Sequence, residues 1–269
     1  KDIRHLVTVT IDGEDAKDFD DAISIKKLED GFQLDVHIAD VSYYVREHTE
    51  LDKEARLRGT SVYVIDRVVP MLPHAISNGL CSLVEGEDRL TITCTMKINK
   101  MGEIETYDIH PSIIRSYKRM TYTNVNRIIK KDKSALNRFE DLVQMVEDMH
   151  LCARIIRQRR RNDGSIDFVS FESKFTLNAK GEITKIEGRT QGEAEMIIED
   201  FMICANQAVA AHLRWLEVPA LYRVHEAPDK KRFAEFSRIA MFWGVKVKYE
   251  HLTPKVVQNL LSRFESKDE

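Results

Sequence analysis

Alternating apolar and polar residues dominate the first half of the chain and predict β-hairpins. Residues 6–12 alternate in this way and run directly into an acidic stretch. Two further alternating segments within residues 22–40 meet at Gly31, which is free to adopt the positive φ of a tight turn. Similar pairs, with Lys-Gly or Lys-x-Gly turns, recur within residues 90–109 and 173–188. The first half is therefore expected to be largely antiparallel sheet.

Helical spacing dominates the later part of the chain. Apolar residues three and four positions apart predict a helix that Ser134 caps and that continues to about residue 160. A second helix is expected over 193–216, apolar on most sides and therefore buried. Two shorter helices should follow over 230–243 and 254–264. The expected fold class is α+β, with antiparallel hairpins in the first half and packed helices in the second.

Length and composition narrow the class of protein. The 269 residues favour one or two domains, and 43% hydrophobic residues are enough to build a core. No window approaches the roughly 18 to 20 apolar residues of a membrane-spanning helix, so no membrane is expected as a partner. The four cysteines show no CxxC or Cys/His spacing. This argues against a zinc site or disulfides and favours a reducing compartment, the cytoplasm.

The net charge of −3 identifies no partner, but the charges are strongly segregated. Residues 12–21 hold six acids and one lysine, a formal charge of −5, whereas residues 154–161 hold five arginines and no acid. Two unit charges ~5 Å apart repel by about 3 kcal/mol at an effective dielectric of 20. Clustered carboxylates therefore require a compensating cation or shifted pKa values.

A solvated acidic loop is the alternative to a cation site in this stretch. Two features argue against it. The acids adjoin strong strand patterns, and the apolar residues Phe19 and Ala22 interleave with Asp18, Asp20 and Asp21. That interleaving implies a fixed and partly buried backbone.

An EF-hand calcium loop does not fit the acidic stretch. Counted from Asp12, the position of the bidentate glutamate falls on Ile23, and the sixth position is not glycine. An all-oxygen site for Mg²⁺ or Mn²⁺ remains, of the kind that substrate phosphate completes. Such ions polarise phosphoryl oxygens and activate water, so the hypothesis is phosphodiester or phosphoryl chemistry.

The segment TIDGEDAKDFDDAI (10–23) resembles the catalytic signature of the RNase II/RNase R (RNB) family of 3′→5′ exoribonucleases, with RNase R as the nearer branch. The resemblance continues along the chain through HIADVSYYV (37–45), RGTSVYVIDRVVPMLP (58–73), SNGLCSL (77–83), RMTYTNV (119–125), IEDFMICAN (198–206) and LYRVHEAPD (221–229). It therefore covers nearly all of residues 1–269 and implies an RNB-type catalytic domain.

The resemblance implies a hydrolase that degrades single-stranded RNA processively from the 3′ end and releases nucleoside 5′-monophosphates. It implies Mg²⁺, with Mn²⁺ as an alternative, two ions when substrate is bound, and a monomeric protein. Asp12, Asp18, Asp20 and Asp21 match the four catalytic, metal-binding aspartates of the family. Asp12 and Asp21 would be the firmest ligands, and Asp20 the acid whose loss stops turnover while RNA still binds.

Further positions match the RNA contacts of the family. Tyr63, Tyr122 and Phe168 correspond to aromatic residues near the 3′ nucleotides, where bases stack on rings; packing in the core is the alternative. Glu199 would lie near the ribose of the terminal nucleotide, where a 2′-OH contact distinguishes RNA from DNA. A buried structural ion pair is the alternative. The sequence does not decide which of Glu199 and Asp200 points inward, although the motif favours Glu199.

Two basic segments complete the set of predicted RNA contacts. Arg223 and His225 alternate on an extended segment, so both could face the RNA; for His225 a structural role is the alternative. The arginines of residues 154–161 end a predicted helix, where cations suit the helix dipole. A solvated helix end is the favoured interpretation of this run, and guidance of the RNA backbone is the alternative.

Compared with the family, the chain is expected to be a partial catalytic domain, truncated at the C-terminus. Cold-shock-like domains would precede Lys1, and an S1 domain and a C-terminal RNB segment with a phosphate-binding arginine would follow Glu269. The isolated fragment is therefore expected to be weakly active or inactive. A non-catalytic single-stranded RNA-binding fragment is the alternative hypothesis. A metal phosphoesterase for small substrates is a third, but it would not explain Tyr63 and Phe168.

Overall fold

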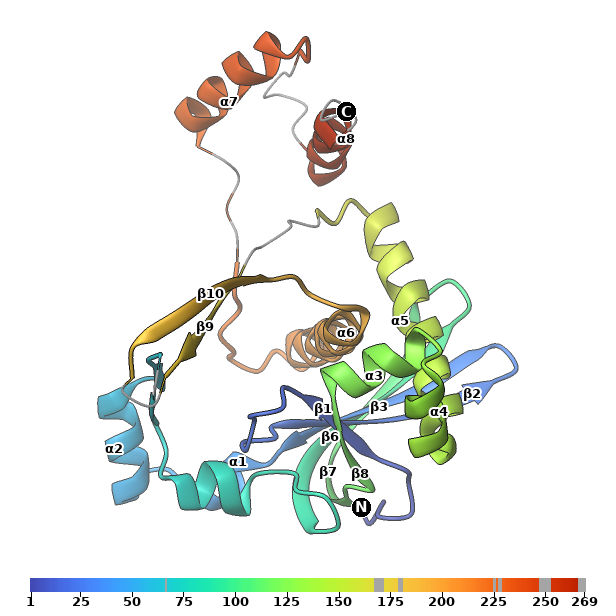
Figure 1. Cartoon of the computed structure of the whole chain (residues 1–269), viewed down its shortest axis with the longest axis vertical. Helices are drawn as coiled ribbons and strands as arrows, with labels where there is room; N and C mark the ends of the chain where they lie inside the picture. The colour runs from blue at the N-terminus through green and yellow to red at the C-terminus, as the bar shows by residue number, and fades with distance from the viewer. Residues whose placement is uncertain are drawn as a thin grey trace.

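The fold was analysed in a computed structural model of the chain. The structure describes residues 1–65, 67–166, 172–178, 181–224, 226, 229–246 and 253–265. Most strands lie in the first half of the chain, with short helices between them, and the last two helices, α7 and α8, lie at one end of the molecule (Figure 1). No helix within these ranges combines the length and apolar character that crossing a membrane requires.

Six strands form the main sheet in the order β7-β6-β3-β2-β1-β8. Their bounds are β1 Val9–Asp12, β2 Asp21–Leu28, β3 Gly31–Ala39, β6 Asp88–Asn99, β7 Ile104–Arg115 and β8 Lys118–Thr121. Neighbouring strands are antiparallel, except for β1 and β8, which run parallel. The predicted hairpins β2–β3 and β6–β7 are thus confirmed.

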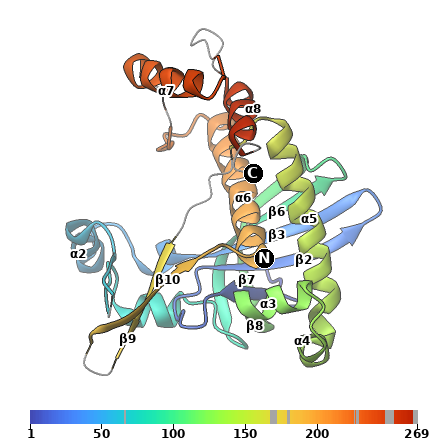
Figure 2. The same ribbon diagram turned by 45° about the horizontal axis from the view of Figure 1, so that its top comes forward.

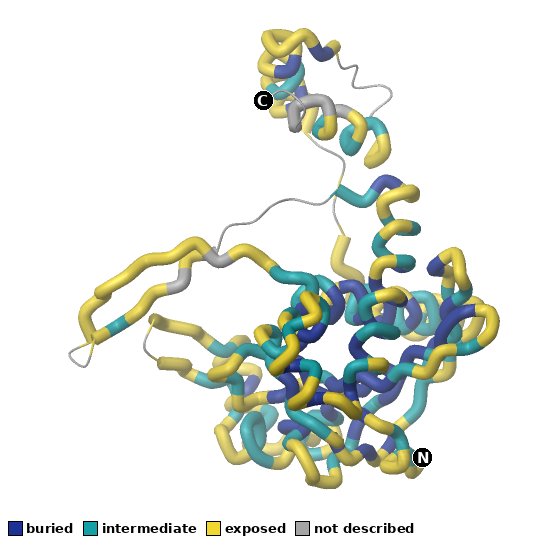
Figure 3. Tube along the Cα trace, turned by 45° about the vertical axis from the view of Figure 1, so that its right-hand side comes forward, coloured by how far each residue is buried: buried dark blue, intermediate teal, exposed yellow. Residues whose placement is uncertain are grey.

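Two short antiparallel ribbons accompany the sheet. The third predicted hairpin forms one of them, from β9 (Glu172–Leu177) and β10 (Ile183–Arg189). The second ribbon, which the hydrophobic pattern did not predict, pairs β4 (Val62–Tyr63) with β5 (Val68–Val69). The β9–β10 ribbon extends away from the body and is largely exposed (Figure 3).

Gly31 shows why the β2–β3 turn needs glycine. Its φ is 148°, as the turn predicted. A Cβ atom at this position would lie 1.9 Å from the carbonyl oxygen of Ile98 on β6. Any side chain here would therefore clash with the neighbouring strand as well as strain the backbone.

The helices are described in chain order. Before β6 lie α1 (Val41–Tyr44), α2 (Glu50–Arg58) and a π-helix, Ala75–Leu80. After β8 come α3 (Tyr122–Ile129), α4 (Lys133–Arg138), the 3₁₀ turn Glu140–Leu142 and α5 (Val143–Asn162). The remaining helices are α6 (Glu193–Trp215), α7 (Lys230–Phe242) and α8 (Pro254–Glu265), close to their predicted bounds.

The long helix predicted from Ser134 to residue 160 is wrong in one respect, because it is broken at Phe139. Asp132, not Ser134, caps α4: its Oδ1 accepts a hydrogen bond from the backbone N–H of Ala135 (3.0 Å). Phe139 has a non-helical backbone (φ −123°, ψ 36°), and its side chain is buried in the core. The apolar spacing thus continues through a bend, which periodicity alone does not reveal.

The main core lies between one face of the sheet and the helices α3, α5 and α6 (Figure 2). Buried strand residues such as Leu34 and Met96 pack in one cluster with Ile128, Met149 and Phe201 of the three helices. Burial on α6 follows the three- and four-residue spacing of a single stripe. The stripe fixes the rotation of α6 about its axis and hence which of its polar residues face outward.

A buried polar network lies on the other face of the sheet. His37 is fully buried on β3, with its Nε2 3.0 Å from the Ser24 hydroxyl and its Nδ1 2.8 Å from the Thr93 hydroxyl. Ser24 also contacts the hydroxyl of Thr8 (2.8 Å). Burial lowers the pKa of His37 to about 3, so the ring is neutral and each nitrogen has a partner.

Candidate metal and RNA site

The acidic loop between β1 and β2 is held in place by the SNGLCSL segment. The Ser82 hydroxyl donates to the carbonyl oxygen of Lys17 (2.8 Å) and accepts from the backbone N–H of Phe19 (3.0 Å). The N–H of Leu83 donates to the carbonyl oxygen of Phe19 (2.9 Å), and the Phe19 side chain is only 6% exposed. The loop backbone is therefore fixed and partly buried, as its interleaved apolar residues predicted.

Arg119 on β8 binds the same loop from the other side. Its Nη2 donates to the carbonyl oxygen of Glu14 (2.6 Å), with the carbonyl oxygens of Gly13 and Ala16 at 3.4 and 3.3 Å. Its guanidinium carbon lies 5.0 Å from the centre of the Phe19 ring. The sequence did not predict this role, although Arg119 begins the RMTYTNV segment that carries the family resemblance.

The four aspartates lie where β1 and β2 meet the loop. Asp12 ends β1 and Asp21 begins β2, both half-buried, whereas Asp18 and Asp20 are exposed in the loop. Burial, followed by the charges of Asp21 and Asp20, raises the pKa of Asp12 to about 7, and Arg119 partly opposes this rise. The four carboxylates therefore lie close enough to influence one another.

The pKa values of Asp21 and Asp20 shift in the same direction. Burial and the charge of Asp20 raise the pKa of Asp21 to about 6. Partial desolvation and the charge of Asp18 raise the pKa of Asp20. Unfavourable burial of several carboxylates side by side is the condition that a bound cation relieves.

The residues present fit a weakly caged divalent ion. The Oδ2 atom of Asp12 is buried and accepts no hydrogen bond from the described residues, so one carboxylate oxygen lacks a partner. Within the described ranges, no group of three or more His, Cys, Asp or Glu side chains is arranged to hold a metal ion. The Asp12 oxygen that has no partner among the described residues suits Mg²⁺, which proteins usually bind through one or two carboxylates, with water and substrate phosphate in the remaining positions.

The predicted aromatic contacts differ in exposure. Tyr63 pairs with Val68 in the β4–β5 ribbon and is 70% exposed, so the core alternative is wrong for this residue. Tyr122 is the first residue of α3, is half-buried and packs against the main core. Part of the Tyr122 ring is therefore packed in the core. Phe168 lies outside the described residues.

The structure shows which of two neighbouring acids on α6 points inward. Asp200 is 2% exposed and accepts hydrogen bonds from Arg157 Nε (2.8 Å) and Arg160 Nη1 (2.7 Å). Glu199 is exposed and therefore available to a ligand. The inward orientation that the motif favoured for Glu199 is therefore wrong, and the structural ion pair belongs to Asp200.

The same ion pairs correct the interpretation of the 154–161 run as a solvated helix end. The side chains of Arg157 and Arg160 are mostly buried against Asp200. Arg223, in the segment after α6, is exposed, and His225 lies outside the described residues. The predicted RNA contacts that the structure places on the surface are thus Tyr63, Glu199 and Arg223.

The structure defines the class as an α+β domain, with a β-sheet covered on one face by helices and an acidic loop at its strand ends. All of residues 1–269 match the RNB domain, and the chain belongs to the RNB family. The resemblance found in the sequence is therefore confirmed.

Curated relatives of the chain include ribonucleases R from several bacteria. The Ribonuclease R of Thermotoga maritima is 47% identical over 266 residues, which are 98% of this chain and 37% of the relative. That of Escherichia coli is 41% identical over 247 residues, which are 91% of this chain and 30% of the relative. The chain thus spans about a third of the length of these relatives.

Solved structures confirm the α+β fold class. Mycoplasma genitalium RNase R, solved in complex with ribose methylated single-stranded RNA, matches with a TM-score of 0.93 and 31% identity, over 98% of this chain and 42% of that chain. Yeast Ssd1, a pseudonuclease, has the same fold, with a TM-score of 0.69 and 18% identity over 89% of this chain.

Proposed function

We propose that this chain forms the catalytic core of a metal-dependent exoribonuclease that degrades single-stranded RNA from the 3′ end. Membership of the RNB family and the ribonuclease R relatives support a hydrolytic 3′→5′ exoribonuclease. The observation that carries the proposal is the acidic loop. It is fixed by Ser82 and Arg119 and leaves one buried oxygen of Asp12 without a partner.

In the proposed mechanism Asp12, Asp18, Asp20 and Asp21 hold divalent ions, Mg²⁺ or Mn²⁺, two of them with substrate bound. When bound, such ions polarise the scissile phosphate and activate water. The loop supplies the geometry, because Ser82 and Arg119 fix its backbone before substrate arrives. Asp20, exposed at the loop surface, is the acid whose loss stops turnover without preventing RNA binding.

The exposed side chains would grip the RNA. Tyr63 offers a free ring for base stacking, worth ~1–3 kcal/mol per base. Glu199 can accept a hydrogen bond from a ribose 2′-OH, and Arg223 can pair with a phosphate. Tyr122, Phe168 and His225 are proposed contacts on the strength of the family resemblance alone. The proposed products are nucleoside 5′-monophosphates, released processively.

We further propose a monomeric cytoplasmic enzyme. All four cysteines are free and buried, as a reducing compartment allows. Because the relatives extend well beyond the matched region, full activity is proposed for a longer protein in which cold-shock-like, S1 and C-terminal RNB segments accompany this domain. Activity is therefore assayed in the intact protein.

The decisive experiment follows 5′-labelled single-stranded RNA in Mg²⁺. The intact protein is expected to shorten it and release mononucleotides. Asp20→Asn should abolish turnover and preserve binding. Asp15→Asn is the matched control: it changes the same charge at an exposed position of the same loop, outside the four matched aspartates, and should retain turnover. An unchanged rate for Asp20→Asn would contradict the assignment.

A second candidate is a non-catalytic RNA-binding protein. Two observations favour it: the yeast pseudonuclease shares the fold, and no three-carboxylate metal group occurs among the described residues. This candidate predicts salt-dependent RNA binding and no mononucleotide with any divalent metal. The assay above distinguishes the two, because binding without product in Mg²⁺ and in Mn²⁺ favours the second.

A further inference from the structure

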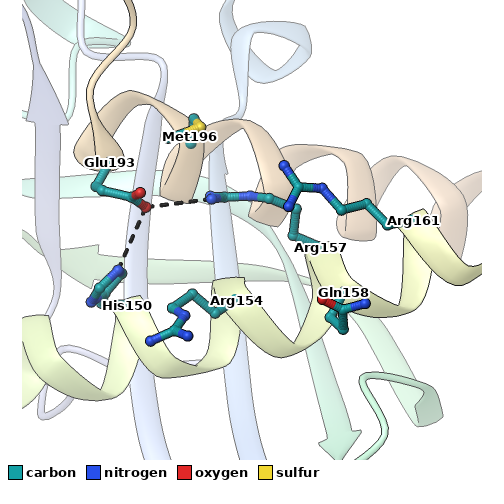
Figure 4. Close-up of a pocket in the computed structure, with 7 residues that line it drawn as sticks. All are labelled: His150, Arg154, Arg157, Gln158, Arg161, Glu193 and Met196. Carbon is teal, nitrogen blue, oxygen red and sulfur yellow. Dashed lines mark hydrogen bonds and ion pairs between the residues drawn. The ribbon is translucent and has the colours of Figure 1, made fainter. Parts of the chain in front are cut away.

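The arginine run of α5 lines a pocket that the proposed catalytic site does not use. The pocket has a volume of about 440 Å³ and lies between α5 and α6 (Figure 4). His150, Arg154, Arg157 and Arg161 contribute from α5 and Glu193 from the start of α6. No residue of the acidic loop lines it.

Helical spacing brings these residues of α5 together. His150, Arg154, Arg157 and Arg161 are separated by four, three and four positions, so they form one stripe along the helix. The stripe spans eleven residue steps, roughly 16 Å at 1.5 Å per residue. Several cations are thus presented along one wall of the pocket.

The pocket carries excess positive charge. Three guanidinium groups line it and one carboxylate, that of Glu193, opposes them. Glu193 is already engaged, with its Oε2 3.3 Å from Arg157 Nη1 and 3.5 Å from His150 Nε2. Arg154 is exposed and forms no ion pair with the described part of the chain. Asp200 balances Arg157 from outside the pocket, so it is the charge of Arg154 that favours an anion.

Arg157 is held with one of its donors unused. Its Nε binds Asp200 and its Nη1 faces Glu193, which fixes the plane of the guanidinium group. Its Nη2 is buried and has no acceptor among the described residues. A buried N–H donor without an acceptor costs about 1–3 kcal/mol, and an anionic oxygen in the pocket would supply the missing partner.

We propose that this pocket binds the phosphate group of a nucleotide, with Arg154 and Arg161 contacting the phosphate and Arg157 fixed behind them by Asp200. Planar, forked guanidinium groups are the side chains best suited to phosphate. The volume suits a ligand of nucleotide size, since small-molecule pockets usually measure about 300–1,000 Å³. The choice of a nucleotide as the ligand rests on the proposed function, in which RNA is the substrate and nucleoside 5′-monophosphates are the products. The positive charge of the pocket does not depend on that function.

Two sources could supply such a phosphate: a free nucleoside 5′-monophosphate or a nucleotide within an RNA strand. The test uses the intact protein with Asp20→Asn in EDTA, so that binding is measured without turnover. The probes are uridine 5′-monophosphate, uridine without phosphate, and a fluorescent ten-nucleotide RNA. Calorimetry and fluorescence anisotropy give the dissociation constants.

The test variant is Arg154→Gln/Arg161→Gln, and the matched control is Lys133→Gln/Arg138→Gln, which removes two exposed cations from α4. The test pair is expected to raise the dissociation constant for uridine 5′-monophosphate at least tenfold if the ligand is free. If the ligand is a nucleotide within a strand, the test pair should raise only the dissociation constant for the RNA, and that constant should depend less steeply on salt. The control pair should change neither constant by more than twofold.

Equal affinities of the test and control variants for both phosphate-bearing probes would overturn the proposal, as would equal binding of uridine and its monophosphate. If the double variant melts at a lower temperature, Arg154→Gln alone, at a site with no ion pair in the described ranges, should still weaken binding about threefold. Failure of the nuclease assignment would look different, because it concerns product formation in Mg²⁺ and leaves these metal-free affinities unaffected.

Discussion

Arg119 donates a hydrogen bond of 2.6 Å to the carbonyl oxygen of Glu14, and this contact joins β8 to the acidic loop between β1 and β2. The residues lie 105 positions apart in the chain. The same guanidinium group covers the Phe19 ring and lowers the pKa of Asp12, in opposition to burial and to the neighbouring acids. One side chain therefore both shapes the loop and balances part of its charge.

Replacing Arg119 should loosen the acidic loop. Arg119→Ala removes a charge-assisted hydrogen bond and the ring contact, and we expect the free energy of unfolding to fall by about 2 kcal/mol. Arg119→Lys keeps the charge but not the fork, so it should recover only part of the loss. Urea denaturation measures the change, and hydrogen exchange of residues 13–19 locates it. Unchanged protection of the loop in Arg119→Ala would show that Ser82 fixes it alone.

At neutral pH and without metal, Asp12 should lower the free energy of unfolding of the protein. Its pKa in the folded protein is about 7, against an ordinary value of 3.8 for an aspartate carboxyl group. Between these values the unfolded chain has lost its proton while the folded chain retains it. The contribution of Asp12 to the free energy of unfolding is therefore fully present below pH 3.8. It declines as the pH rises towards 7, by on the order of 2–4 kcal/mol.

Asp12→Asn tests this relation. In EDTA the variant is expected to be more stable than the native chain at pH 8, with the difference vanishing near pH 4. Adding Mg²⁺ should raise the melting temperature of the native chain and have little effect on the variant. Calorimetric melts at both pH values measure these changes. A variant less stable than the native chain at pH 8 in EDTA would contradict the explanation.

Local features of the fold could be predicted from sequence, because their causes are local. Strand alternation and the positive φ of Gly31 identified the hairpins of the sheet. The density of carboxylates in residues 12–21 predicted raised pKa values, and Phe19 predicted a buried loop backbone. Each of these inferences depends on residues within about ten positions of one another.

The contacts that the sequence did not reveal join distant segments. Ser82 holds Phe19 across 63 positions, and nothing in the sequence around either residue indicates that pairing. Glu199 and Asp200 are adjacent acids with similar apolar neighbours, and their sequence does not show that Arg157 and Arg160 of α5 pair with Asp200. The break at Phe139 likewise depends on how its ring enters the core.

The two adjacent acids of α6 should respond differently to the same substitution. Asp200→Asn removes the charge that balances two mostly buried arginines, so we expect a loss of about 3–5 kcal/mol in stability. Glu199→Gln at the exposed neighbouring position should leave stability within about 0.5 kcal/mol and reduce discrimination between RNA and DNA. Denaturation curves and competition binding separate the effects. Equal destabilisation by both substitutions would contradict the assigned orientation.

His37 should make the sheet sensitive to acid. Burial lowers its pKa in the folded protein to about 3, against an ordinary value of 6.5 for a histidine side chain. The stability it contributes is complete above pH 6.5 and is lost as the pH falls towards 3, because the unfolded chain binds the proton first. His37→Gln offers both a donor and an acceptor to Ser24 and Thr93 without titrating. Its stability relative to the native chain should improve steadily between pH 6.5 and pH 4, and a constant difference would exclude His37 as the cause.

Tyr63 separates RNA binding from stability. Its ring is 70% exposed on the β4–β5 ribbon, so Tyr63→Ala should change the free energy of unfolding by less than about 0.5 kcal/mol. Loss of one stacked base should nevertheless weaken single-stranded RNA binding by ~1–3 kcal/mol, roughly five- to 150-fold. Tyr63→Phe keeps the stacking face and should bind nearly as the native chain does. Anisotropy with a ten-nucleotide RNA measures all three proteins. If Tyr63→Ala and Tyr63→Phe bind alike, base stacking at this position is excluded, and the exposed ribbon contacts the strand through its backbone or not at all.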